Sequence, residues 1–79
     1  MFYIIQSQDT LGYLRSIHSD ENATPEWTWS MDEAKKFDTV KTALSTVVLD
    51  EETYHPVILS MRKDDSTIWG VFDFKGRLK

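Results

Sequence analysis

The segment from Trp27 to Thr39 is the sequence feature that most constrains the fold. It places Trp27 and Trp29 two residues apart, a spacing that puts both side chains on one face of a strand end. Ser30 and Glu33 follow at the spacing of a capping box, in which each side chain bonds a backbone N–H of the other residue. The segment therefore predicts that a strand gives way here to a helical turn, which we expect to run from Met31 to Lys36.

A clearer helix is predicted directly after this turn, with Asp38 or Thr39 as its cap. Apolar residues recur at the i, i+3, i+4, i+7 and i+8 positions that form one stripe on a helix. These residues are Val40, Ala43, Leu44, Val47 and Val48. The pattern predicts an amphipathic helix with one face buried against a sheet.

Strand-like segments flank this helical region on both sides. Their β-branched and aromatic residues, separated by polar turns, predict a hairpin before the helices, a short third strand and a second hairpin after them. The expected strands cover residues 2–8, 13–19, 26–29, 54–62 and 67–74. The order β-β-(β)-α-α-β-β predicts an α+β fold, an antiparallel sheet of four to five strands with one main amphipathic helix on one face. The length of 79 residues indicates a single domain, residues 1–79, and the strand order stays open.

Both faces of the predicted strands carry apolar residues. Phe2 and Ile4 should lie on one face and Tyr3 and Ile5 on the other. In the last strand, Ile68, Phe72 and Phe74 are expected on one face and Trp69 and Val71 on the other. A sheet covered by a single helix should alternate apolar and polar residues more strictly. Either the short helix and the 20–29 loop cover the second face, or that face meets a partner, which could be a second copy of the chain.

The charge of −4 is unevenly distributed along the chain. Residues 20–52 hold nine acidic residues against three lysines, whereas the rest of the chain holds six basic residues against four acidic ones. Binding to duplex DNA normally needs a basic surface that releases counterions. We therefore do not expect nucleic acid as a partner, although Trp27, Trp29 or Trp69 stacking on single-stranded bases stays open as an alternative.

No motif for catalysis or for a cofactor is present. The absence of cysteine excludes disulfides, thiolate zinc sites and cysteine nucleophiles. His18 and His55 lack the spacing of metal ligands, no serine lies in a G-x-S-x-G motif, and the three glycines are too dispersed for a phosphate loop. We expect a protein that is not an enzyme and binds no cofactor and no metal.

The N-terminal residues 1–6 lack a basic start followed by a long apolar run. We therefore expect no signal peptide and no membrane span. Because cysteine is also absent, we expect a cytoplasmic protein.

The residues Tyr3-Ile4-Ile5, then Trp29, then Ala34-Lys35-Lys36-Phe37-Asp38-Thr39 before a helix containing Ala43 form a further pattern. In this pattern the chain resembles small accessory proteins of bacteriophages and prophages. Some proteins of that group bind and inhibit host enzymes or host defence proteins. The resemblance implies a non-catalytic protein binder, a phage-type inhibitor or modulator of a host protein, and it supplies no functional residues.

Candidate partner-binding residues come from the acidic segments and the tryptophans. They are Asp20, Glu21, Asp50, Glu51, Glu52, Trp69 and Trp27. The acidic groups would steer a partner protein with a basic surface, and the aromatic rings would anchor it. Ordinary solvated turns and core packing are the alternative explanations of these residues. The other functions left open are a homodimeric structural domain and a binder of single-stranded nucleic acid.

Overall fold

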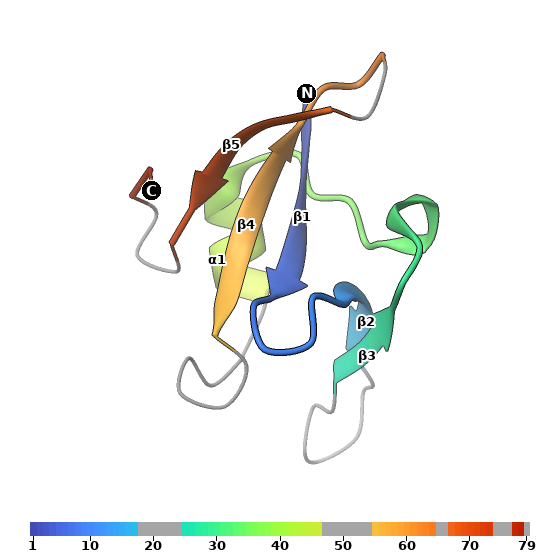
Figure 1. Ribbon diagram of the computed structural model, residues 1–79. Coiled ribbons are helices and arrows are strands. Elements are labelled where there is room, and N and C mark those ends of the chain that lie inside the picture. Colours follow the sequence, from blue (N-terminus) through green and yellow to red (C-terminus); the bar gives the residue numbers. More distant parts are fainter. Residues whose placement is uncertain (18–24, 47–54, 65–66, 74–76, 79) are drawn as a thin grey trace.

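The computed structural model describes residues 1–17, 25–46, 55–64, 67–73 and 77–78 (Figure 1). Its strands are β1 (Phe2–Ser7), β2 (Tyr13–Ile17), β3 (Pro25–Thr28), β4 (Pro56–Met61) and β5 (Ile68–Phe72). They form one five-stranded antiparallel sheet in the order β3-β2-β1-β4-β5. This confirms the predicted antiparallel sheet and shows that the two hairpins join through β1 and β4.

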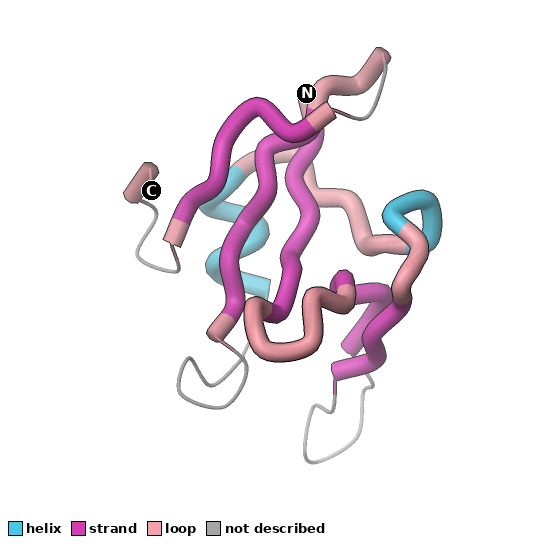
Figure 2. The backbone as a smooth tube through the Cα atoms, viewed as in Figure 1, coloured by secondary structure: helices cyan, strands magenta, loops and turns pink. Residues whose placement is uncertain are grey.

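Helix makes up only a small part of the described residues. The 3₁₀ helix η1 spans Met31–Glu33, and the α-helix α1 spans Val40–Thr46 and lies across one face of the sheet (Figures 1 and 2). Ala43 of α1 is fully buried and belongs to the core on that face of the sheet. The fold is therefore mostly β, and the predicted α+β fold with one main amphipathic helix overstated the helix. Val47 and Val48, at the end of the predicted stripe, lie outside the described residues.

The cap of one helix is as the sequence predicts, and the cap of the other is not. Thr39 caps α1 as predicted, because its Oγ1 accepts a hydrogen bond of 3.0 Å from the backbone N–H of Thr42. The predicted capping box is wrong, because the Ser30 side chain forms no capping hydrogen bond. Instead, the Thr28 hydroxyl donates to the Glu33 carboxylate at 2.9 Å and accepts a hydrogen bond from the Ser30 backbone N–H at 3.1 Å.

Residues 35–37 run between β1 and β2, where the first hairpin opens. The two strands pair near their turn, where Gln6 lies opposite Tyr13. Further along, Tyr3 and Phe37 exchange backbone hydrogen bonds of 2.9 and 2.8 Å, and the Lys35 N–H donates to the Leu14 carbonyl at 2.8 Å. The inserted segment thus satisfies backbone groups that the open hairpin would leave unpaired.

Each face of the sheet has its own core. The helix-side core contains Ile5, Leu14, Phe37, Ala43 and Ile58. The second-face core contains Ile4, Ala34, Val57, Leu59 and Met61. Met31 of η1 packs against the second-face core, and Ala34, the residue after η1, belongs to it. The short helical turn therefore covers part of the second face, as one of the two alternatives proposed, and residues 20–24 of the loop named with it lie outside the described residues.

A bulge at Trp69 changes which side chains of β5 share a face. Ile68 pairs with Met61 of the second-face core, whereas Phe72 packs against the helix-side core. The prediction that Ile68 and Phe72 share a face is wrong, because the extra residue of a bulge shifts the alternation by one. Phe74, the third residue of that predicted set, lies outside the described residues.

Candidate functional site

Several large apolar side chains stay exposed after folding. Among the described residues these are Met1, Leu11, Trp29, Ile68, Trp69 and Leu78. Ile68 and Trp69 are consecutive in β5, with 51% and 62% of their surface exposed. Adjacent exposed apolar residues mark interaction sites more often than scattered ones do. We refer to Ile68 and Trp69, together with Arg62 at the end of the neighbouring strand, as the β5 surface.

Arg62 lies over the ring of Trp69. Its guanidinium carbon is 5.4 Å from the ring centre, which is the geometry of a cation–π contact. The Arg62 backbone N–H also donates to the Thr67 carbonyl at 2.9 Å, which closes the turn between β4 and β5. No carboxylate in the described ranges forms an ion pair with Arg62. The guanidinium therefore keeps its charge available beside the exposed ring.

The outer edge of β5 is open over part of its length. β4 pairs with β5 on one side, as the left-hand edge of the sheet in Figure 1 shows. On the other side, Leu78 bridges to Phe72, and the Asp73 N–H donates to the Arg77 carbonyl at 2.8 Å. From Ile68 to Val71, no strand of the described chain pairs with this outer side.

The two edges of the sheet differ in their chemistry. β3 begins with Pro25 and Glu26, and proline and charged residues are common means of preventing an edge strand from pairing with another chain. β5 has the sequence Ile-Trp-Gly-Val-Phe, with no proline and no charged residue. Only the bulge at Trp69 interrupts it. Of the two edges, β5 is the one better suited to contact another molecule.

The structure places the predicted site residues in three different ways. Trp69 is exposed, as an anchoring residue must be. Trp27 is half-buried opposite Leu14 and packs against the helix-side core. Asp20, Glu21, Asp50, Glu51 and Glu52 lie outside the described residues. The sequence analysis did not select Ile68 or Arg62 for this site, because the exposure of Ile68 and the contact of Arg62 with Trp69 follow from the strand pairing and the bulge.

His55 differs from its predicted place within a strand. It lies just before β4 with a positive φ of 45°, and its Nδ1 is 2.9 Å from a carboxylate oxygen of Asp9. The pair joins the turn after β1 to the start of β4. In the described part of the chain, no group of three or more histidine or acidic side chains is arranged to hold a metal ion. His18 lies outside that part.

Two further observations concern membrane spans and relatives. Within the described ranges, neither helix has the length and apolar character that crossing a membrane requires. Comparison of the chain with protein-family models, with curated proteins and with solved structures finds no match. Function must therefore be inferred from the geometry of the surface itself.

Proposed function

We propose that this chain is a small non-catalytic module that binds another protein through the β5 surface. The observation that carries the proposal is the exposure of Ile68 and Trp69 side by side, with the Arg62 guanidinium held over the indole ring. Tryptophan and arginine are the residue types most enriched among the side chains that dominate binding energy at interfaces. Trp69 is the proposed anchor.

The open edge of β5 gives a partner a second means of attachment. A partner segment in extended conformation can add its backbone hydrogen bonds to an exposed strand edge. Here that edge is limited to residues 68–71, because Leu78 occupies the position beside Phe72. We therefore propose that side-chain contacts with Trp69 and Ile68 dominate and that backbone pairing adds to them.

The proposed biological role is inhibition or modulation of a host protein in the cytoplasm, as in small phage proteins. The resemblance of the Tyr3-Ile4-Ile5 strand and the Ala34–Thr39 segment to such proteins supports this role. In this proposal the acidic residues 20–21 and 50–52 steer a partner that has a basic surface. Such charges mainly raise the association rate and make it sensitive to salt.

The proposal is tested by affinity capture from a nuclease-treated bacterial lysate with three baits. They are the wild type, Trp69→Ala and the control Trp29→Ala, which removes an indole that is 76% exposed but lies outside β5. A protein retained by the wild type and by the control, and lost by Trp69→Ala, is the expected result. Retention of the same proteins by all three baits would show that the β5 surface binds none of them.

A homodimer is the second candidate, and the open, uncharged edge of β5 favours it, because such an edge can pair with a second copy of itself. Sedimentation over a wide range of protein concentrations tests this candidate. A dimer that Trp69→Ala dissociates would identify the second copy as the partner. A monomer at all concentrations would remove this candidate and leave the heterologous partner.

A further inference from the structure

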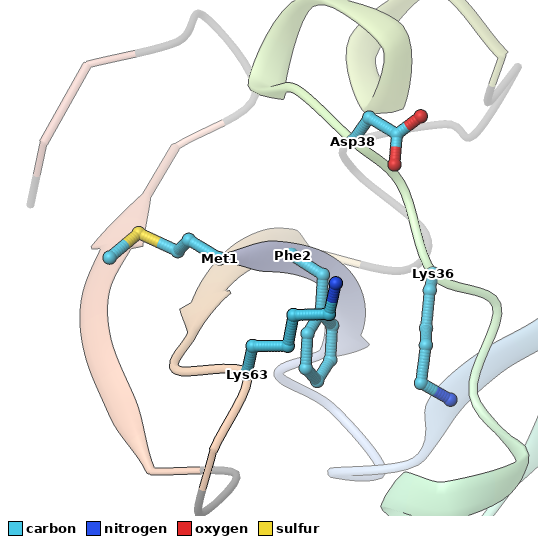
Figure 3. Close-up of a pocket in the computed structure, with 5 residues that line it drawn as sticks. All are labelled: Met1, Phe2, Lys36, Asp38 and Lys63. Carbon is cyan, nitrogen blue, oxygen red and sulfur yellow. The ribbon is translucent and has the colours of Figure 1, made fainter.

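A pocket opens at the start of β1, separate from the residues of the β5 surface. It has a volume of about 370 Å³ and is lined by Met1, Phe2, Lys36, Asp38 and Lys63 (Figure 3). Pockets that hold small molecules usually measure about 300–1,000 Å³ and combine apolar walls with a few polar groups. This pocket has that composition, because Met1 and Phe2 are apolar and the other three side chains are charged.

The segment that carries Lys36 is held in place by its neighbours. The Lys35 N–H donates to the Leu14 carbonyl at 2.8 Å. Phe37 exchanges two backbone hydrogen bonds with Tyr3, of 2.8 and 2.9 Å. Because Lys36 lies between these two attachment points, its backbone is fixed on the sheet although its side chain is exposed.

The aromatic side of the pocket is also anchored. Phe2 pairs with Met61 of β4, which is fully buried. The Lys36 ammonium lies 5.7 Å from the centre of the Phe2 ring and donates a hydrogen bond to the Asp32 carbonyl at 3.3 Å. Lys63 reaches the same pocket from the turn after β4, so that the two lysines approach Phe2 from different segments (Figure 3).

The pocket is locally positive on a chain whose net charge is −4. The side chains that line it carry two positive charges, on Lys36 and Lys63, and one negative charge, on Asp38. No ion pair within 4.0 Å joins either lysine to a carboxylate of the described residues, Asp38 included. No carboxylate of the described residues therefore neutralises either lysine, although the Lys36 ammonium also contacts the Phe2 ring and the Asp32 carbonyl.

We infer that this pocket binds a small organic anion whose phosphate or carboxylate group is held by Lys36 and Lys63 and whose apolar body rests against Phe2 and Met1. Lysine ammonium groups bind such anions as compact point charges. Asp38 repels the anionic group and so directs it toward the lysines. This inference is independent of the proposed protein-binding function, because it uses none of the residues of the β5 surface.

The test is a titration of the full chain followed by the NMR shifts of its backbone amides. The probes are phenyl phosphate, phenylacetate and inorganic phosphate. A ring-bearing probe should produce saturable shifts at residues 2–3, 35–38 and 62–64. Inorganic phosphate should bind at least about fivefold more weakly, because it leaves the apolar wall uncovered. Saturation by only one ring-bearing probe would identify its anionic group as the one recognised.

Lysine variants make the test specific to the pocket. Lys36→Ala and Lys63→Ala should each weaken binding of the ring-bearing probe about tenfold, because each removes one charged contact. Lys41→Ala removes an exposed lysine of α1 outside the pocket and should leave binding unchanged. Absence of saturation by both ring-bearing probes up to about 20 mM would overturn the inference, since the dissociation constants would then lie well above the millimolar range. Equal binding by the pocket variants and the wild type would overturn it as well.

Discussion

Replacing Phe37 with alanine tests the insertion of residues 35–37 into the sheet. Phe37 is 3% exposed, lies in the helix-side core with Ile5 and Leu14, and shares two backbone hydrogen bonds with Tyr3. Truncation of a buried phenylalanine to alanine costs about 3–5 kcal/mol, through lost burial and the cavity left behind. At about 0.05–0.15 kcal/mol per residue, a domain of 79 residues has a free energy of unfolding of about 4–12 kcal/mol. Phe37→Ala should therefore remove a large part of that stability.

The assay is urea unfolding followed by circular dichroism and tryptophan fluorescence. Phe37→Leu keeps an apolar side chain at the site and should cost less than Phe37→Ala, about 1–1.5 kcal/mol, which keeps the comparison measurable if the alanine variant does not fold. Leu11→Ala removes a leucine that is 57% exposed and should change stability by no more than about 0.5 kcal/mol. A loss below about 1 kcal/mol for Phe37→Ala would refute the placement of this ring in the core.

Three further predictions concern a cap, the contact of a histidine with an aspartate, and a partner class. Thr39→Ala should lower the free energy of unfolding by about 1 kcal/mol, because it removes the hydrogen bond to the Thr42 N–H, and Thr39→Ser should restore it in the same urea assay. His55→Ala should cost less than about 1 kcal/mol, because the pair with Asp9 is half-exposed, and a larger loss would show that the pair does more than join two turns. Single-stranded oligonucleotides at low salt should leave tryptophan fluorescence unchanged, and quenching that disappears in Trp69→Ala would instead assign the β5 surface to nucleic acid.

Most of the correct sequence predictions rest on the alternation of side chains between the two faces of a strand. In strand β1, Ile4 belongs to the second-face core with Phe2 packed against it, and Ile5 belongs to the helix-side core with Tyr3 packed against it, as a period of two requires. Thr39 was identified as one of two possible caps because threonine is a favoured residue at that position. These features depend on residues close together in the sequence, so that a single sequence is enough to predict them.

The errors occurred where a group outside the recognised pattern takes a bonding partner, whether that group is near in the sequence or far away. Ser30 and Glu33 have the spacing of a capping box, but the hydroxyl of Thr28 at the end of β3 takes the Glu33 carboxylate. The pairing of Phe37 with Tyr3 joins segments far apart in the sequence, and no local pattern marks it. Long-range pairing of this kind overrides local preference and cannot be read from spacing alone.

The candidate site was predicted only in part for the same reason. Trp27 and Trp69 have similar sequence surroundings, since both lie in short strands rich in aromatic or β-branched residues. Their exposure differs because Trp27 faces Leu14 across a strand pair, whereas Trp69 is the extra residue of a bulge on an edge strand. Because both tryptophans lie on edge strands, only the register of the strand pairing separates the tryptophan that packs against the core from the one that can anchor a partner.

The central claim is that Trp69 anchors a partner protein on the β5 surface. Its most direct test is the dissociation constant of the captured partner, measured by calorimetry for the wild type, Trp69→Ala and Trp29→Ala. An anchoring residue contributes about 2 kcal/mol or more on truncation, so Trp69→Ala should bind at least about thirtyfold more weakly, while Trp29→Ala binds as the wild type does. Equal affinity of the Trp69→Ala variant and the wild type would contradict the claim.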